Sequence, residues 1–359
     1  MNFFKHQKYN YLVLLMIVLA LFSTYTPLSS RYIFENVHTV KEDLSVQFNS
    51  GLLIGFRNDL DKTTTYRTLW IAPDKDNNLK VLKELNYILV PHRDNFWQIE
   101  PLRYSFTNTG DWIEYPVAHA VGDSYTPETF EYKYNTYNCK LNFVDRNHVS
   151  ISTYTKYHPT KEKSYAREDC AVVELEKLTH YRNTEDKLTM VDVFKENALS
   201  TINKISKTKI TLGESADTHN INTTTGDSWT ISRVDGKWIP QIAKTFKYAS
   251  KNSNYTLYNT TLQLPQSIVS YNDLCTDFNL IKEIIPDAKD AISSPDKDIL
   301  GVFTDNKLTL YAYSKGTIGK AALEIQLNEN ETMIMNQWTS GNSVEQWTDA
   351  FNKSLPVID

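Results

Sequence analysis

Runs of β-branched and aromatic residues alternate with short polar turns along most of the chain. In four places, two such runs flank a turn of Asp, Asn or Gly. The first runs lie at residues 85–90, 139–144, 229–233 and 299–303, and their partners lie at 96–99, 148–151, 238–239 and 308–313. Asp, Asn and Gly close hairpins because they tolerate left-handed dihedrals and bond their own backbone. We therefore predict four antiparallel hairpins.

Three segments follow the helical period instead. They lie near residues 189–205, 278–285 and 343–355. Thr189 with Asp192 has the spacing of a helix N-cap, and Ser343 with Gln346 has that of a capping box. The apolar stripes of these segments are expected to dock on the sheets.

The strand pattern predicts a mainly β fold. Four short strands in about 40–50 residues are typical of a propeller blade, so propeller-like antiparallel blades with a few peripheral helices are the first expectation. Because the spacing of the turns is irregular, two linked β-domains are the alternative. The polar, Thr-rich segment 206–227 predicts a loop or linker between an N-terminal β-rich part (31–205) and a C-terminal one (228–359), which ends in an amphipathic helix.

Residues 1–30 follow the pattern of an export signal. Lys5 and Lys8 precede the uncharged apolar run 11–22, which suits a signal peptide or an N-terminal hydrophobic helix. No small-x-small site follows this run, so an uncleaved signal anchor is slightly favoured. Residues 11–26 would then cross the membrane once, with the bulk of the chain outside. If the leader is cleaved, the protein is secreted.

Composition and charge limit the partners. Aromatic residues make up 12% of the chain, which favours sheets. The formal net charge of −5 gives no general attraction for nucleic acid or for anionic lipid. We predict no nucleic-acid partner.

Three cysteines leave one thiol over after any pairing. They are Cys139, Cys170 and Cys275. An exported setting permits a disulfide, and Cys139–Cys170 is the preferred pair because both lie near strand beginnings in one meander. Three free buried thiols are the alternative.

The most tempting catalytic cluster is the segment 213–217 with His219, which holds a serine, an acid and a histidine. In a nucleophile elbow a second Gly would stand where Asp217 stands, and a helix would follow. A solvated loop is the better interpretation. No Walker A, dinucleotide or zinc spacing occurs either, so no cofactor, metal or catalytic residue is predicted.

Three further groups of residues have structural interpretations. Asp74 and Asp76 alternate like the start of a calcium loop, but the later Gly and Glu of such a loop are lacking, so a hairpin turn is expected. Glu174 and Glu176 are predicted to form a solvent-facing row on one strand. Trp112 is expected to be the most exposed of the seven Trp residues, with most of the others in the core.

Several segments carry a resemblance to known proteins. They are residues 90–97, 227–229, 235–238 and the stretch from Ala288 to Trp347, which includes 331–338 and 344–347. In them the chain resembles a group of uncharacterised exported β-rich proteins from Gram-positive spore-forming bacteria. The resemblance implies a cell-surface setting and no defined activity. Members carry an export signal or a lipid anchor, and this chain lacks the lipidated cysteine.

Three functions are consistent with these observations. The first is a non-enzymatic surface protein that binds a ligand or partner through loops on a rigid sheet. The second is a hydrolase of cell-wall glycan or peptide, with a site assembled only in the fold. The third is a membrane-anchored sensor or regulator, which requires the leader to stay uncleaved.

Overall fold

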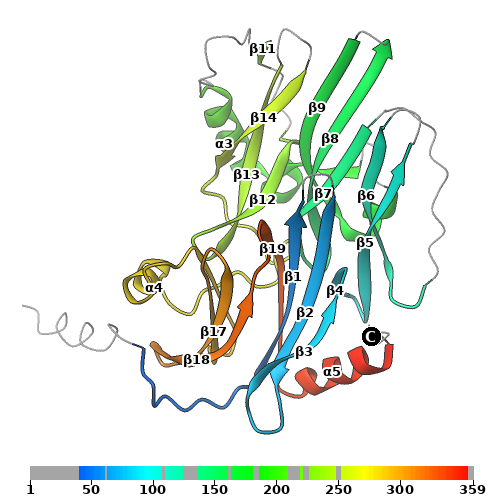
Figure 1. Cartoon of the computed structure of the whole chain (residues 1–359). Coiled ribbons are helices and arrows are strands. Elements are labelled where there is room, and N and C mark those ends of the chain that lie inside the picture. The colour runs from blue at the N-terminus through cyan, green and yellow to red at the C-terminus, as the bar shows by residue number, and fades with distance from the viewer. Residues whose placement is uncertain are drawn as a thin grey trace, which may run out of the picture.

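The chain is mainly β, with its strands in three sheets (Figure 1). The computed structural model describes residues 40–60, 63–106, 110–123, 136–160, 163–180, 186–208, 219–220, 226–247 and 252–354. None of the three sheets closes on itself. The prediction of a mainly β fold with peripheral helices is confirmed. The predicted leader, residues 1–30, lies outside the described residues.

The first sheet joins strands from opposite ends of the described chain. Its order is β19 (Glu331–Ser340), β1 (Ser50–Asp59), β2 (Thr64–Pro73) and β3 (Leu79–Leu85), all antiparallel. In β1 every position from Ser50 to Phe56 is buried, because both faces of the strand are covered. The sheet therefore depends on a contact between segments nearly 300 residues apart, Ser50 with Ser340.

The second sheet contains eleven strands. Their order is β11 (His219–Asn220), β13 (Lys237–Lys247), β14 (Ser253–Asn259), β9 (Lys163–Glu174), β8 (His148–Thr160), β7 (Thr136–Val144), β6 (Trp112–Ala120), β5 (Asn95–Ser105) and β4 (Ile88–His92), with β10 (Lys187–Leu188) beside β9 and β12 (Trp229–Val234) beside β13. The β6–β7 contact is parallel over two residue pairs, and the β14–β9 contact is parallel over one. The sheet is thus three antiparallel units, β4–β6, β7–β9 and β12–β14, that diverge from each other.

The third sheet runs in chain order through β15 (Asp290–Ser293), β16 (Ile299–Phe303), β17 (Lys307–Ser314) and β18 (Thr317–Gln326).

The described chain therefore has five antiparallel units, and polar contacts tie successive units together. Thr68 Oγ1 donates to Tyr87 O at 2.7 Å, Ser150 Oγ lies 2.6 Å from Thr230 Oγ1, Arg233 Nε donates to Asp290 at 2.9 Å, and Asp298 accepts from Asn49 N at 2.6 Å. The last of these contacts leads back to the start of β1.

The four predicted hairpins are confirmed as β4–β5, β7–β8, β12–β13 and β16–β17. The β12–β13 turn shows why its residues were needed. Asp235 has a φ of 48° and Gly236 a φ of 80°, which are both left-handed, as a two-residue type I′ turn requires. A side chain at Gly236 would also come within 2.8 Å of Leu274.

The helix predicted after Thr189 forms as two helices. They are α2 (Met190–Phe194) and α3 (Glu196–Ser206). Thr189 and Asp192 make the predicted capping contacts, with Asp192 N donating to Thr189 Oγ1 at 3.1 Å. The expected single helix is wrong at Lys195, whose φ of 53° turns the chain between the two.

The other predicted helices are α4 (Phe278–Ile284) and α5 (Asn342–Ser354); a 3-10 helix, η1 (Leu175–His180), was not expected. Since α5 begins at Asn342, Ser343 is its second residue and not its cap.

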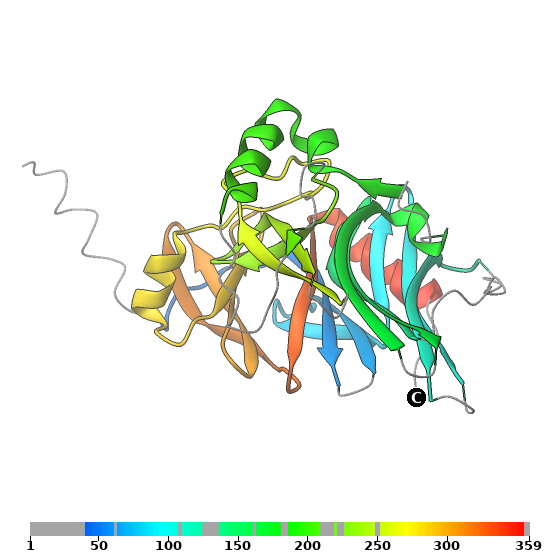
Figure 2. The same cartoon turned by 90° about the horizontal axis from the view of Figure 1, so that it is seen from above.

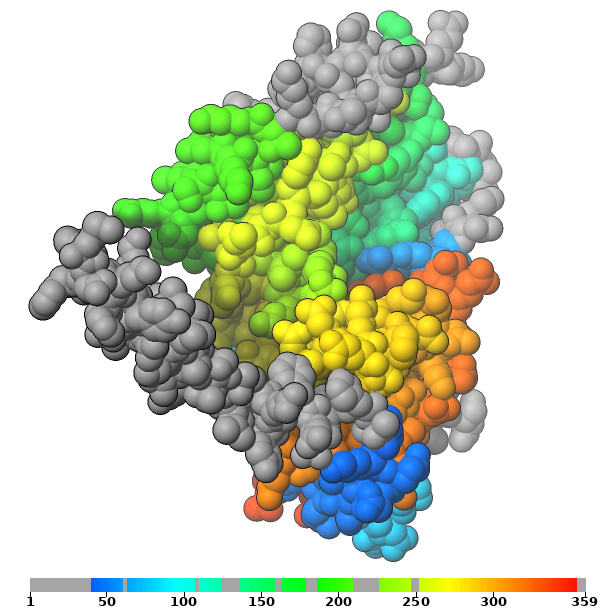
Figure 3. Space-filling view, turned by 90° about the vertical axis from the view of Figure 1, so that its left-hand side faces the viewer, coloured from blue at the N-terminus to red at the C-terminus, as the bar shows by residue number. Residues whose placement is uncertain are grey.

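The helices cover the sheets. Figure 3 shows α2 and α3 (green) beside β13 and β14 (yellow-green), with α4 (yellow) next to the third sheet (orange). Figure 2 shows α5 (red) against β1–β6 (blue to cyan), where the ring centroids of Trp347 and Trp70 are 5.6 Å apart.

Lys244 of β13 is a fully buried lysine that caps α3. Its Nζ donates to Ser206 O at 2.9 Å and also to Thr208 O. Lysine is almost never this buried unless its charge is paired or hydrogen-bonded, and the last carbonyls of a helix favour a cation. The cap explains how α3 ends against the sheet.

Replacing Lys244 by Met should lower the free energy of unfolding by about 2 kcal/mol, because the buried carbonyls lose their donor. Urea unfolding followed by circular dichroism measures this. Lys204→Met changes an exposed lysine of α3, the helix that Lys244 caps. It should lower the free energy of unfolding by less than about 0.5 kcal/mol. Equal effects of the two substitutions would contradict a capping role.

The predicted Cys139–Cys170 disulfide is not formed, because all three cysteines are free thiols. Strand β8 lies between the two residues: Cys139 is opposite Thr153, and Cys170 is opposite Ser152. Two strand spacings are about 9–10 Å, beyond the reach of a disulfide, and consecutive positions on β8 face opposite sides of the sheet.

A thiol count tests this correction. Unfolding the chain without reductant in the presence of Ellman's reagent should yield three reactive thiols, as expected from the free cysteines. A count of one would mean that two cysteines are paired and that the strand register given above is wrong.

Among the described residues, no helix has the length and apolar character needed to cross a bilayer. Most of the predicted linker 206–227 lies outside those residues, so the two-part division remains a prediction. Strands from both sides of it share the second sheet, where Ser253 of β14 pairs with Arg167 of β9.

Candidate functional site

The ends of β1 and β2 carry polar side chains on both faces. Successive residues of a strand point to opposite faces, so Arg57 and Asp59 share one face with Tyr66. Asn58 lies on the other face with Arg67. The first face meets β7, and the second borders a surface depression.

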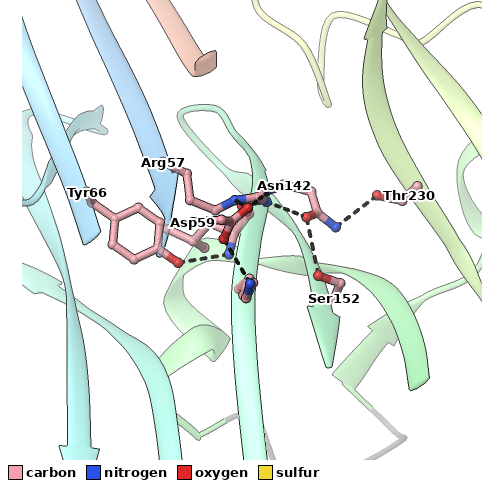
Figure 4. A network of polar contacts seen from close by, with 8 residues as sticks. Arg57, Asp59, Tyr66, Asn142, Ser152 and Thr230 are labelled. Atoms are coloured by element: carbon pink, nitrogen blue, oxygen red, sulfur yellow. Dashed lines mark hydrogen bonds and ion pairs between the residues drawn. The ribbon is translucent and has the colours of Figure 1, made fainter. Parts of the chain in front are cut away.

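Two side chains of the first face bond the backbone of β7. Leu141 N donates to Tyr66 Oη at 3.1 Å, and Arg57 Nη1 donates to Leu141 O at 2.5 Å (Figure 4). Since β6 pairs with β7 only near Tyr137 and Asn138, it does not reach Leu141. A buried backbone group without a partner costs about as much as a lost hydrogen bond. The two side chains therefore replace a missing strand.

Asp59 joins two cations beside this contact. Arg57 Nε donates to Asp59 Oδ2 at 3.0 Å, and Lys140 Nζ donates to Asp59 Oδ1 at 2.9 Å. All three side chains are partly buried. Two positive charges thus face one negative charge, so the contact carries one net positive charge.

Asn142 extends these contacts to the neighbouring unit. Its Oδ1 accepts from Arg57 at 2.7 Å and from Ser152 at 3.3 Å, and its Nδ2 donates to Thr230 at 3.4 Å (Figure 4). Arg57, Asp59, Tyr66, Lys140, Asn142, Ser152 and Thr230 together form what we name the Arg57 network. It spans three of the five units.

Beside the network, Glu114 is buried where β6 and β7 separate. Its Oε1 accepts from Thr64 N at 3.2 Å, and Arg103 lies 3.5 Å from its Oε2. Asn138 is its neighbour on β7. Thr64 Oγ1 and Asn138 Oδ1 are buried and have no partner among the described residues. Burial raises the pKa of Glu114, although Thr64 and Arg103 oppose this.

The chemistry of this face is that of a structural bracket. Burial raises the pKa of Tyr66 well above its usual value, so Tyr66 stays protonated as a donor and acceptor near neutral pH. Asp59 and Arg57 already satisfy each other.

Replacing Tyr66 by Phe should lower the free energy of unfolding by about 1–2 kcal/mol, because the buried N–H of Leu141 loses its acceptor. Chemical unfolding measures this loss. Tyr157→Phe removes the hydroxyl of a residue that is 46% exposed and should have little effect. If Tyr66→Phe leaves the free energy of unfolding unchanged, water must take the place of the hydroxyl as the acceptor for Leu141 N.

The other face of the hairpin borders an open depression of about 510 Å³. It is built where β1, β2, the β3–β4 turn and the β18–β19 turn meet. Its lining residues are Asn58, Thr65, Tyr66, Arg67, Glu84, Leu85, Asn86, Asn328 and Glu331. Most of these side chains are polar, and three are amides.

Arg67 fixes the floor of the depression. It makes a two-point contact with Glu331, at 2.6 Å from both Nε and Nη2, and it also reaches Glu84 at 3.2 Å and Gln326 O at 3.1 Å. Its guanidinium lies 5.2 Å from the ring centre of Phe56. Burial disfavours the charge of Arg67, but Glu331 outweighs this and raises its pKa. The side chain of Arg67 is therefore held in place by its contacts and keeps its charge.

The most buried acids elsewhere hold the units together. Asp145 accepts from Ser270 N at 3.1 Å and from Gln337 Nε2 at 3.0 Å. Burial raises its pKa, and these donors oppose the rise. For Asp169, burial would raise the pKa, but Lys187 at 2.9 Å brings it below its usual value.

The thiols are also structural. Burial raises the pKa of Cys139 and of Cys170 to about 12. Because the thiolate is the nucleophile, neither sulfur is activated near neutral pH.

One predicted acidic pair is corrected. Glu174 ends β9, but Glu176 lies in η1 and not on the strand. Glu176 Oε1 lies 2.9 Å from His92 Nε2 and also pairs with Arg93, and His92 Nδ1 lies 2.5 Å from Arg146 O. The predicted solvent-facing row is therefore wrong, because the chain turns at Leu175.

The other predicted positions are spread over the surface. Asp74 forms the expected β2–β3 turn, accepting from Asp76 N and Asn78 N at 2.9 Å each. Trp112 is half-buried, with Arg103 at 5.0 Å from its ring. The segment 213–217 lies outside the described residues. Asp74 lies in a turn of the first sheet and Trp112 begins β6 of the second, and the described part of the chain contains no metal-holding cluster of His, Cys, Asp or Glu.

No family model matches the chain, and neither a curated protein nor a solved structure is significantly similar to it. The geometry alone therefore has to support a function.

Proposed function

We propose that the chain is an exported or membrane-anchored protein that binds a ligand or partner outside the cytoplasm without chemically changing it. The observation that carries this proposal is the polar depression beside Arg67, whose ion pairs are complete before any ligand arrives. Such preorganised polar surfaces lose little freedom on binding. The buried acids with shifted pKa values, Glu114, Asp145 and Asp169, lie outside this depression.

The arrangement of the five units supports a propeller-like architecture as the scaffold of this function. In chain order the units are β1–β3 with β19, β4–β6, β7–β9, β12–β14 and β15–β18. Side-chain or strand contacts join each unit to the next, and Asp298 joins the last to the first through Asn49. Closing the first unit with the last strand of the described chain is the usual device that seals a ring of blades. Two linked β-domains remain the alternative.

The location rests on the leader. The apolar run 11–22 after Lys5 and Lys8 supports export, with residues 11–26 as the anchor if they are retained. The mildly acidic chain and the resemblance to exported proteins of spore-forming bacteria agree with a cell-surface setting. A protein in this location would meet the polymers of the cell envelope, so we take one of them as the ligand to test.

Co-sedimentation with purified Gram-positive peptidoglycan sacculi tests the proposal. The full chain, in detergent micelles, should pellet with the sacculi in a saturable way and release no reducing ends or free amino groups during hours of incubation. Release of either product would favour the hydrolase alternative. A chain that neither pellets nor releases product would contradict the proposed function for this envelope polymer.

A second measurement separates an anchored protein from a secreted one. Mass spectrometry of the N-terminus in the membrane fraction and in the medium should find residues 1–22 intact in the membrane. Their loss, with the protein in the medium, would contradict the anchor. An intact anchor is also what a sensor needs.

A further inference from the structure

Arg67 is the one cation of the depression, and it gives its donors to other groups of the protein, as does the neighbouring Asn328. Arg67 gives its N–H groups to Glu331, Glu84 and Gln326 O. Asn328 donates through its N at 2.9 Å and its Nδ2 at 3.4 Å, both to Glu331. A phosphate or a carboxylate would need a free cation, and the guanidinium of Arg67 is already committed to Glu331 and Glu84.

Acceptors remain. Asn58 Oδ1 is buried and has no partner among the described residues. Only one oxygen of Glu84, Oε1, accepts from Arg67, and this side chain is 57% exposed at the rim. The second oxygen of Glu84 is open to a donor supplied by a ligand. The depression therefore favours a ligand that donates.

The charge of the lining has the matching sign. One arginine faces two glutamates, Glu84 and Glu331, so the lining carries one excess negative charge. Glu331 is consumed by Arg67, with a side chain only 1% exposed. The accessible negative charge is thus that of Glu84.

The depression lacks an aromatic platform. Its one aromatic lining residue, Tyr66, turns its hydroxyl to Leu141 on the opposite face of the hairpin. Aromatic faces hold sugars and nucleobases by stacking. No such aromatic face is open in the described lining, so we expect a ligand other than a sugar or a nucleobase.

We propose that this depression binds a primary ammonium group, such as an alkylamine or the side chain of a lysine residue in a peptide. An ammonium group supplies three donors and one positive charge, which match the exposed carboxylate of Glu84 and the excess negative charge of the lining. This inference rests on the proposed binding function and names the ligand class of its site.

An NMR titration of the full chain in micelles, labelled with ¹⁵N-asparagine, tests the inference with n-butylammonium chloride at pH 7. The side-chain amide signals of Asn58, Asn86 and Asn328 should shift and saturate. n-Butanol has the same alkyl chain without the charge and should produce no saturable shift. Saturation with n-butanol at the same concentration would overturn the assignment.

Variants of the rim sharpen the test. Glu84→Gln should weaken n-butylammonium binding about fivefold, as expected for one partly exposed charge, and Glu84→Lys should abolish it. Glu174→Gln changes an acid that is 51% exposed outside the depression and should leave binding unchanged. Equal affinity in Glu84→Gln and in the unaltered chain would overturn the proposal.

The two proposals fail separately. If the chain pellets with sacculi and n-butylammonium does not bind, the ligand class is wrong and the binding function stands. If n-butylammonium binds at the depression and no sacculi are retained, the site is real and the proposed envelope ligand is wrong.

Discussion

A chain that ends after Asn328 will not fold cooperatively. This truncation removes β19 and α5, so that β1 loses its partner from Ser50 to Asn58. It also removes Ile334, Met335 and Trp338 from the core. Each large buried side chain is worth about 2–5 kcal/mol, and a native domain has only about 5–15 kcal/mol in total.

Thermal unfolding followed by circular dichroism measures this effect. The truncated chain should show no sigmoidal transition and should bind a hydrophobic dye at 25 °C. A chain that ends after Ser354 keeps β19 and α5 and is the matched control, with an unchanged transition. A cooperative transition in the shorter chain would mean that the other units fold without closure by β19.

The local elements could be predicted from the sequence because their causes are local. Asp235 and Gly236 suit the left-handed dihedrals of a tight turn, and Thr189 with Asp192 caps a helix whatever the rest of the chain does. The break at Lys195 could not be read in the same way. Its φ of 53° suits no lysine preference, so the surrounding packing imposes it.

The partners of the strands were not predictable, because register and pairing between distant strands depend on the whole fold. Nothing near Ser50 points to Ser340, and nothing near Arg167 points to Ser253. The Cys139–Cys170 disulfide was predicted wrongly for the same reason, since the order of the strands was not known. Cys139 and Cys170 are close in the meander, yet one strand separates them.

Neither the Arg57 network nor the depression was predicted. The only signal in the sequence is that residues 57–59 and 64–67 are uninterrupted polar runs at the ends of two apolar strands. Because successive residues of a strand point to opposite faces, such runs put polar side chains on both faces of the hairpin end. They do not say that one face is a bracket for β7 and that the other is an open surface, since those neighbours come from elsewhere in the chain.

Replacing Asp145 by Ala should lower the free energy of unfolding by about 3 kcal/mol. Its Oδ2 accepts from Ser270 N, from Ser270 Oγ and from Gln337 Nε2, all at 3.0–3.1 Å, and its Oδ1 accepts from Arg146 N at 2.7 Å. These donors belong to the β7–β8 turn, to β19 and to the segment before α4, so one carboxylate joins three parts of the chain. Removing it leaves buried donors unpaired, at about 1–3 kcal/mol each before relaxation.

Asp305→Ala is the matched control, because Asp305 also closes a hairpin, between β16 and β17, but its side chain is 84% exposed and pairs with Lys289 at 3.5 Å. Chemical denaturation should place its loss below about 0.5 kcal/mol. Turn chemistry is similar at the two sites, so the difference between the variants isolates the contribution of burial. If both variants lose the same small amount, Asp145 acts only as a turn residue, and the junction between β7, β19 and the segment before α4 does not depend on its carboxylate.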